Sequence, residues 1–292
     1  MLMKCLFGLI LVLATSVVIR ADPIPDGFDK NITAFVFLVG TNGQPTTPNG
    51  TCFFVGVDTP RGSFVYLVTA KHVLQESNGA FVPQICVRMM NTNDEAGFAY
   101  FPLNDTNGIN RVFTHPEKGV DLAVVPVVPN IGRNFHVGVL PADLIATKER
   151  MKKFKVREGD EMFFMGLFTP FYGSKANFPI VRFGRLSMLT DERIPADKDG
   201  PQEYYLMETQ VFGGNSGSAA LFYFDERRNP MDTKILLAGV IKGYFVNYAP
   251  IKFIDTRATP FATENNGIAL VTPGFKLNEL LYSDELKRLR GE

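Results

Sequence analysis

Ser216 has the surroundings expected of a serine nucleophile. It lies in the segment GGNSGS, residues 213–218, directly after the strand-like run YYLMETQVF. Glycines near a serine let the backbone turn sharply and let a substrate carbonyl approach, and the main-chain N–H groups of Gly214 and Ser216 can then receive an oxyanion. A surface turn has a similar composition, so the prediction depends on a base and a carboxylate elsewhere in the chain.

Two other segments supply that base and that carboxylate. The apolar run FVYLVTAKHVL, residues 64–74, carries His72 near its end, and GVDLAVVPV, residues 119–127, places Asp121 just before an apolar run. In acyl transfer a histidine takes the proton of the serine, while an aspartate orients the imidazole and stabilises its charged form. The order His72, Asp121, Ser216 therefore predicts nucleophilic acyl transfer.

The three segments together resemble a known family. TAKHV, DLAVV and GGNSGS resemble the active-site signatures of chymotrypsin-like (trypsin-like) serine proteases. The type is bacterial, similar to glutamyl-endopeptidase-like and high-temperature-requirement-like members without an appended peptide-binding domain. The resemblance implies a secreted serine endopeptidase with His72, Asp121 and Ser216 as catalytic residues, and with the N–H groups of Gly214 and Ser216 as oxyanion hole. Here the serine follows the histidine and the aspartate in the sequence, whereas in α/β-hydrolases the serine precedes both partners.

The resemblance also places a substrate-binding pocket. It implies that Gln210 lies at the base of the pocket and that Ile241, Gly243 and Gly267 belong to its walls. Because none of these residues is acidic, a buried substrate arginine or lysine would lack compensation, and we expect an apolar or uncharged polar residue before the scissile bond. Lys242 either attracts an acidic side chain or is a solvated strand residue.

The sequence departs from the zymogen-type members of the family. Asn215 occupies the position of their aspartate, and the expected mature start, ADPIPDG, lacks the apolar terminus that pairs with it. Losing both partners leaves no uncompensated buried charge. This predicts an enzyme that is active on folding, without insertion of a new N-terminus. The alternative is a catalytically silent, protease-like binding module.

Composition and the N-terminus indicate a secreted globular protein. The 292 residues are 46% apolar and 21% charged with a formal net charge of zero, so nothing predicts a nucleic-acid partner. Residues 1–21 read as a signal peptide whose apolar run is too short to span a bilayer, which predicts secretion or a periplasmic location without stable membrane insertion.

The cysteines and histidines predict no cofactor. Two cysteines remain after residues 1–21, and the three histidines are scattered, so no metal-ligand spacing exists. The sequence leaves open whether Cys52 and Cys86 form a disulfide bond or stay buried free thiols. It also leaves the oligomeric state open. The expected partners are protein or peptide substrates.

The elements needed to position the site are strands. Short apolar runs separated by Gly, Pro, Asn and Asp predict an all-β fold of two six-stranded antiparallel β-barrels, at residues 22–135 and 136–292, with a helix at the C-terminus. The first barrel would carry the histidine and aspartate, and the second the serine. We expect the loop at residues 170–179 to border the substrate cleft. His115 is a second candidate base, although a turn histidine is the simpler interpretation.

Overall fold

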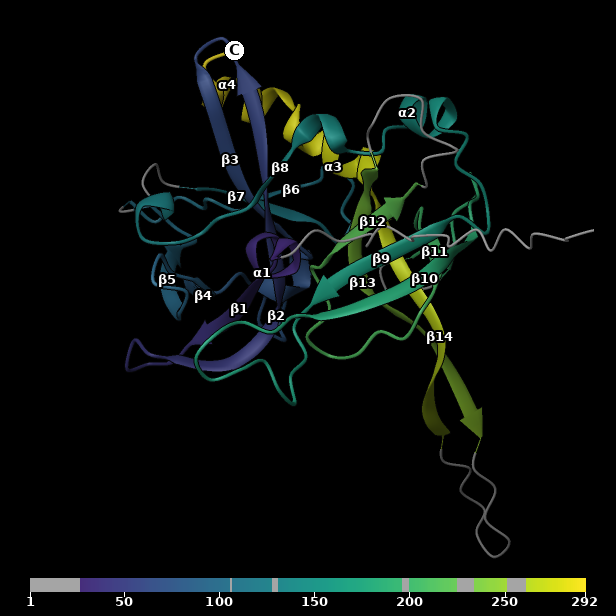
Figure 1. Cartoon of the computed structure of the whole chain (residues 1–292), viewed down its shortest axis with the longest axis horizontal. Coiled ribbons are helices and arrows are strands. Elements are labelled where there is room, and N and C mark those ends of the chain that lie inside the picture. Colours follow the sequence, from purple (N-terminus) through teal and green to yellow (C-terminus); the bar gives the residue numbers. More distant parts are fainter. Residues whose placement is uncertain (1–26, 106, 128–130, 196–199, 225–233, 251–260) are drawn as a thin grey trace, which may run out of the picture.

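Strands account for most of the regular secondary structure in the described part of the chain (Figure 1). The computed structural model describes residues 27–105, 107–127, 131–195, 200–224, 234–250 and 261–292. The predicted all-β class with a helical C-terminus is confirmed. The predicted signal peptide lies outside the described residues. No helix in the described part of the chain has the length and apolar character needed to cross a membrane.

The N-terminal half is an eight-stranded sheet in the order β5-β4-β1-β2-β3-β7-β6, with β8 pairing parallel to β2. Its six longer strands are the six predicted from the sequence, and the additional ones are the short β6 and β8. The division at residue 135 stays a prediction, although β8, which follows it, pairs with the N-terminal sheet. The strands are β1 (Ala34–Val39), β2 (Pro45–Thr59), β3 (Gly62–Thr69), β4 (Gln84–Met90), β5 (Ala96–Pro102), β6 (Phe113–Thr114), β7 (Ala123–Pro126) and β8 (Val139–Pro141).

The C-terminal half is a closed barrel in the order β10-β11-β14-β13-β12-β9, as six strands were predicted to form. Its interior is filled by buried side chains such as Phe164, Phe222 and Ile241. Their neighbours along the strands, such as Phe163 and Leu221, point to the other face and are also buried, in the cluster shared with the N-terminal half. The short helix α2 (Lys148–Lys153) precedes it. The strands are β9 (Glu161–Gly166), β10 (Ile180–Met188), β11 (Tyr205–Glu208), β12 (Ala219–Tyr223), β13 (Ile235–Pro250) and β14 (Phe261–Pro273).

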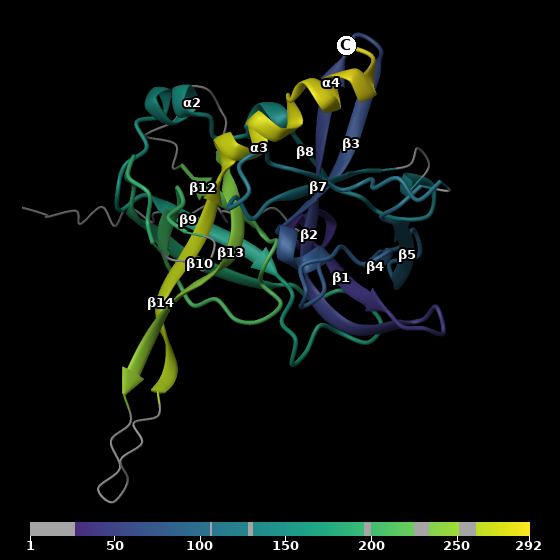
Figure 2. The ribbon, with the colours of Figure 1, turned by 180° about the vertical axis from the view of Figure 1, so that it is seen from behind.

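Two helices follow the barrel and join it to the other half. Figure 2 shows α3 (Gly274–Leu281) and α4 (Asp284–Arg290) running from the barrel toward β3. Leu277 and Leu286 belong to one buried cluster with side chains of both halves. The buried Arg290 donates to the Tyr66 hydroxyl at 3.3 Å and to the Leu281 carbonyl at 2.7 Å. The predicted helical C-terminus consists of two helices, which pack on both halves of the molecule.

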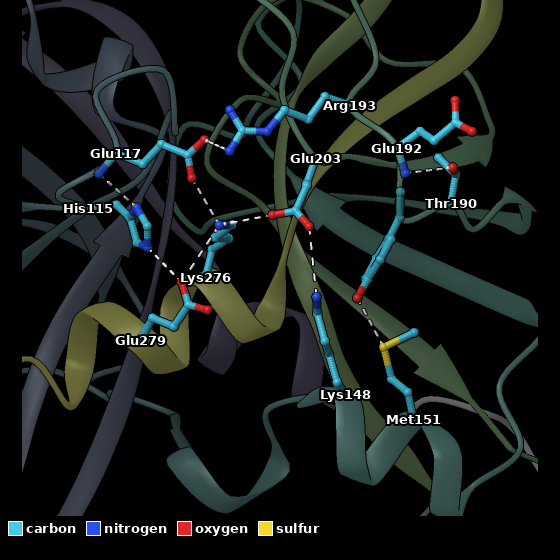
Figure 3. A network of polar contacts seen from close by, with 11 residues as sticks. His115, Glu117, Lys148, Met151, Thr190, Glu192, Arg193, Glu203, Lys276 and Glu279 are labelled. Atoms are coloured by element: carbon cyan, nitrogen blue, oxygen red, sulfur yellow. Dashed lines mark hydrogen bonds and ion pairs between the residues drawn. The ribbon is translucent and has the colours of Figure 1, made fainter.

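A polar network also connects the halves beside α3 (Figure 3). The Lys276 Nζ lies 3.0 Å from a carboxylate oxygen of Glu117 and 3.0 Å from one of Glu203. Glu117 precedes β7 in the N-terminal half, whereas Glu203 precedes β11 in the barrel. The His115 Nδ1 accepts from the Glu117 N–H at 3.2 Å, and its Nε2 donates to a carboxylate oxygen of Glu279 at 2.8 Å. Lys276 can be almost fully buried because carboxylates from both halves balance its charge.

Cys52 and Cys86 are buried free thiols. Cys52 lies on β2 and Cys86 on β4, and β1 runs between these two strands. Neighbouring strands lie about 4.8 Å apart, which puts strands on either side of a third roughly 10 Å apart. A disulfide bond needs Cα atoms within about 7 Å. The order of the strands therefore excludes a disulfide bond between Cys52 and Cys86, which the sequence had left open.

Candidate active site

His72 and Asp121 meet at the end of the β3–β7 pair. Thr69 of β3 pairs with Ala123 of β7, so the chain that leaves β3 and the chain that enters β7 lie side by side. His72 sits in the short 3-10 helix at Lys71–Leu74 that follows β3. The antiparallel register therefore brings together two residues that are far apart in the sequence.

Asp121 contacts His72 through both carboxylate oxygens. One oxygen accepts from the ring Nδ1 of His72 at 2.5 Å, and the other accepts from its backbone N–H at 3.0 Å. The Asp121 side chain is buried, whereas that of His72 is about half exposed. Two bonds fix both the position and the ring orientation of the histidine, and they leave its Nε2 directed away from the carboxylate.

The environment of Asp121 keeps its carboxylate charged. Burial raises the pKa of this group, but the hydrogen bonds and the charge of His72, with a smaller contribution from Lys242, outweigh burial and hold the pKa below its ordinary value. A charged carboxylate at this place stabilises an imidazolium on His72. The pair is therefore suited to accept a proton from a hydroxyl group.

Ser216 lies in the second of two consecutive tight turns. The Asn215 N–H donates to the Phe212 carbonyl at 3.0 Å, and the Ser218 N–H donates to the Asn215 carbonyl at 3.1 Å. The third residues of these turns, Gly214 and Gly217, have φ values of 98° and 89°. Positive φ at this position favours glycine, as in a type II turn. The two glycines recognised in the sequence are thus required by the backbone that presents the serine.

Added side chains would also collide at both glycines. A Cβ atom on Gly217 would overlap the Thr51 carbonyl oxygen, and one on Gly214 would lie 2.7 Å from the Thr169 side chain. The turn therefore packs directly against β2 of the N-terminal half and against the segment that follows β9. The N–H groups of Gly214 and Ser216, the predicted oxyanion hole, belong to this packed turn.

Asn215 is buried, and both ends of its amide are paired. Its oxygen accepts from the Phe212 N–H at 2.8 Å, and its nitrogen donates to the Leu167 carbonyl at 2.8 Å. A neutral amide satisfied by the backbone takes the place at which the zymogen-type members carry an aspartate. Burial here leaves no unpaired charge.

The Ser216 hydroxyl donates to the Lys242 carbonyl at 2.8 Å. No hydrogen bond joins Ser216 to His72, both of which lie in the described part of the chain. The two residues nevertheless lie in the same region, near Gly50. A Cβ atom added to Gly50 would touch both the Ser216 carbonyl and the side chain of Val73, which follows His72. The structure brings all three predicted catalytic residues to one region, with the serine turned toward β13.

The predicted pocket residues fall into two groups. The exposed Gln210 reaches Gly267, where a Cβ would lie 3.3 Å from its amide nitrogen, and Gly243 has open space beside it. Ile241 requires a correction, because its side chain is fully buried in the barrel core and cannot line a pocket. Only its backbone reaches the site, where its carbonyl accepts from the Gly217 N–H at 2.8 Å.

Two further basic residues are placed by the structure. His115, the alternative base, belongs to the network around Lys276, where it contacts Glu279 and not Asp121. Lys242 is partly buried, and its ammonium lies 5.5 Å from the centre of the Tyr204 ring. Burial lowers the pKa of Lys242, opposed by Asp121. Lys242 is accordingly not the fully solvated residue considered from the sequence.

Sequence reasoning missed the residues that support the turn from the other half of the molecule. The Thr51 hydroxyl donates to the Gly214 carbonyl at 2.8 Å and accepts from the Leu167 N–H at 2.9 Å. The Thr51 N–H donates to the Ser216 carbonyl at 2.8 Å. A threonine in a strand carries no local signal of this role. Nothing in the described residues groups three or more His, Cys, Asp or Glu side chains around a possible metal ion.

Two kinds of similarity connect this chain to known proteins. The model of the trypsin-like peptidase domain family matches residues 50–224, which include His72, Asp121 and Ser216. No curated protein matches. Among solved structures, the crystal structure of Deg5 is similar with a TM-score of 0.43 and 14% identity, covering 73% of this chain and 80% of that one. An inactive Ser343Ala mutant of Rv3671c from M. tuberculosis is similar with a TM-score of 0.43 and 16% identity, covering 87% and 86%.

Proposed function

Because this chain belongs to the family of trypsin-like peptidase domains, we propose that it is a serine endopeptidase that cleaves peptide bonds through an acyl-enzyme. The observation that carries this proposal is the pair of hydrogen bonds between Asp121 and His72, in the same region as a serine held in two consecutive turns with glycine at positive φ. These features orient a base and expose a nucleophile, as acyl transfer requires.

In the proposed reaction the Ser216 Oγ attacks the substrate carbonyl carbon while His72 Nε2 takes the hydroxyl proton. The oxyanion is received by the N–H groups of Gly214 and Ser216. The carbon–nitrogen bond then breaks as His72 returns the proton to the leaving amine, which leaves an ester on Ser216. Water, deprotonated by the same imidazole, hydrolyses the ester and restores the serine. Asp121 stays ionised throughout and stabilises the imidazolium.

The serine has to change partner before this reaction. Its hydroxyl donates to the Lys242 carbonyl, and in the proposed reaction it turns from this carbonyl toward His72. Catalytic hydrogen bonds often form only in the complex with substrate. We assign the observed contact to a resting position of the nucleophile.

The neutral, fully paired Asn215 supports activity without insertion of a new N-terminus. In the proposed enzyme the turn is held by backbone partners and by Thr51, so no ion pair is needed to form it. The proposal includes secretion to the periplasm or the cell exterior after removal of residues 1–21. It also includes protein or peptide substrates with an apolar or uncharged polar residue before the scissile bond, because Gln210 and Gly267 offer no charge to that side chain.

One observation favours the alternative, a silent protease-like binding module. If the Ser216–Lys242 contact persisted with substrate bound, His72 would have no hydroxyl to deprotonate. The two functions differ in whether Ser216 is reactive.

Covalent labelling by a fluorophosphonate probe separates them. The probe should modify the purified protein at Ser216, as located by mass spectrometry of peptides. Ser216→Ala should abolish labelling, and His72→Ala should reduce it strongly. Circular dichroism should show that both variants are folded. An unlabelled but folded native protein would contradict the peptidase and favour the binding module.

A further inference from the structure

Two phenylalanines are exposed as a stacked pair near the nucleophile turn. Phe171 is 64% exposed and Phe178 is 47% exposed. Their ring centres lie 6.4 Å apart at an interplanar angle of 26°. Both belong to the segment 167–179 that joins β9 to β10. Two stacked aromatic rings in water offer an apolar surface that the side chain of a binding partner can cover.

The segment that carries the pair is held rigidly by the other half of the molecule. The buried Arg88 of β4 donates to the carbonyls of Tyr172, Gly173 and Ser174 at 3.2, 2.8 and 3.1 Å. It also donates to the Asn177 side chain at 2.6 Å. No carboxylate among the described residues contacts this guanidinium. A buried cation satisfied by loop carbonyls fixes the path of the loop, so the two rings are presented in a preformed position.

The same segment touches the turn that carries the nucleophile. The Thr169 hydroxyl donates to the Gly213 carbonyl at 3.4 Å, and its methyl group packs against Gly214. Phe171 is two residues further along, which is at most about 7 Å, or the span of two extended residues. The pocket residues Gly243 and Gly267 lie on β13 and β14. Ser216 contacts β13 through the hydrogen bond from its hydroxyl to the Lys242 carbonyl. Among the described residues, the polar contacts given above for the loop lead to Gly213 and to Arg88 of β4, and none of them involves the two strands that carry the pocket.

We propose that Phe171 and Phe178 bind the part of a substrate that follows the scissile bond, and that they select aromatic or large aliphatic side chains within its first three residues. The inference rests on the proposed peptidase function and adds a substrate class to it. The pocket side takes the acyl part of the substrate, so the leaving part extends over the loop. Flat aromatic surfaces favour an aromatic or large aliphatic partner.

The charge beside the pair favours the same class of substrate. The Lys30 Nζ lies 5.1 Å from the centre of the Phe178 ring. A lysine or arginine on the substrate would meet this cation at the edge of the rings. Basic residues should therefore be depleted from the positions that follow the scissile bond, while aromatic and aliphatic residues are enriched.

Cleavage of a peptide library tests the inference. The native protein and the Phe171→Ala/Phe178→Ala double variant are incubated with the same library, and cleavage sites are identified by mass spectrometry. Two matched fluorogenic peptides then differ only in carrying Phe or Ala as the second residue after the scissile bond. We expect the native protein to prefer the Phe peptide by about three- to tenfold in kcat/KM, and the double variant to lose that preference.

Controls separate this inference from the proposed function. Leu289→Ala, on the exposed face of α4, should keep the native preference. Phe171→Leu should retain a preference for aliphatic residues. An unchanged cleavage profile in a folded, active double variant would overturn the inference and leave the peptidase proposal intact. Absence of both cleavage and fluorophosphonate labelling in the native protein would overturn both.

Discussion

The Thr51 hydroxyl and the Gly214 carbonyl are hydrogen-bonded at 2.8 Å across the boundary between the two halves. Thr51 lies on β2 of the N-terminal sheet, whereas Gly214 lies in the nucleophile turn of the barrel. The carbonyl that this contact fixes belongs to the peptide plane between the two expected oxyanion donors. The N-terminal half therefore helps to shape the oxyanion turn as well as supplying the histidine and aspartate.

Thr51→Val should reduce activity more than it reduces folding. The substitution leaves the Gly214 carbonyl and the Leu167 N–H buried without partners, each at a cost of about 1–3 kcal/mol in stability. Displacement of the turn should lower kcat/KM by about tenfold or more, measured together with chemical denaturation. Thr51→Ser retains the hydroxyl and should restore activity. Full activity in the valine variant would show that the contact does not orient the turn.

Asp121→Asn should nearly abolish peptidase activity while the fold persists. The amide cannot stabilise an imidazolium, and its N–H group can force the wrong histidine tautomer, which in a Ser-His-Asp triad lowers kcat by about four orders of magnitude. Steady-state kinetics would measure the loss of activity, and thermal unfolding would show whether the variant is folded. A loss of less than about tenfold would mean that Asp121 is not the orienting carboxylate.

Arg88→Met should loosen the loop that carries Phe171 and Phe178. The change removes four hydrogen bonds to the loop while keeping a buried chain of similar length. Faster hydrogen exchange and faster cleavage by an added protease are expected within residues 167–179, with little change in α4. Arg88→Lys keeps the positive charge but loses the planar guanidinium group. Its rates of exchange and cleavage in the loop should lie between those of the native protein and Arg88→Met. Unchanged exchange in Arg88→Met would contradict the role of Arg88 as the anchor of the loop.

The network around Lys276 should make stability sensitive to acid. The hydrogen bond from Lys276 is the main cause that holds the pKa of Glu117 below its ordinary value of 4.5. A group with a lowered folded-state pKa stabilises above its ordinary pKa, and this contribution is lost as pH falls through the folded-state pKa. Denaturation at pH 7 and at pH 3 should therefore show a steeper loss in the native protein than in Lys276→Met.

The same substitution also has an expected cost at neutral pH. Lys276→Met removes the cation that three partly exposed carboxylates share, although Glu117 keeps its contact with Arg193 and Glu203 its contact with Lys148. We expect a loss of about 1–3 kcal/mol in the free energy of unfolding. Leu289→Ala is the matched control on the neighbouring helix. Equal pH dependence of Lys276→Met and the native protein would exclude the network as the source of acid sensitivity.

Cys52 and Cys86 should be unreactive in the folded protein. Burial raises the pKa of both thiols, to about 11 for Cys86, so about one Cys86 thiol in a thousand is ionised at pH 8. A maleimide should label both residues only after unfolding, without a reducing agent. Two cysteines that become reactive only after reduction would instead show a disulfide bond.

The sequence by itself determined the identity of the candidate site and the class of the fold. His72 and Ser216 follow apolar runs, Asp121 precedes one, and Gly214 and Gly217 mark backbone with positive φ, so these signals are local. The strands of the barrel were predictable for the same reason, because apolar runs between turn residues need no knowledge of their partners. The short β6 and β8 were missed because strands of two or three residues carry no pattern.

The tertiary structure alone decided the features that depend on which strands are neighbours. Cys52 and Cys86 stay apart because β1 separates their strands. Thr51 supports the nucleophile turn because β2 packs against it, and Ile241 turns into the core because of the alternation of side chains along β13. Arg88 fixes a loop more than 80 residues away. Contacts of this range arise when the two halves close on each other, and no short stretch of sequence encodes them.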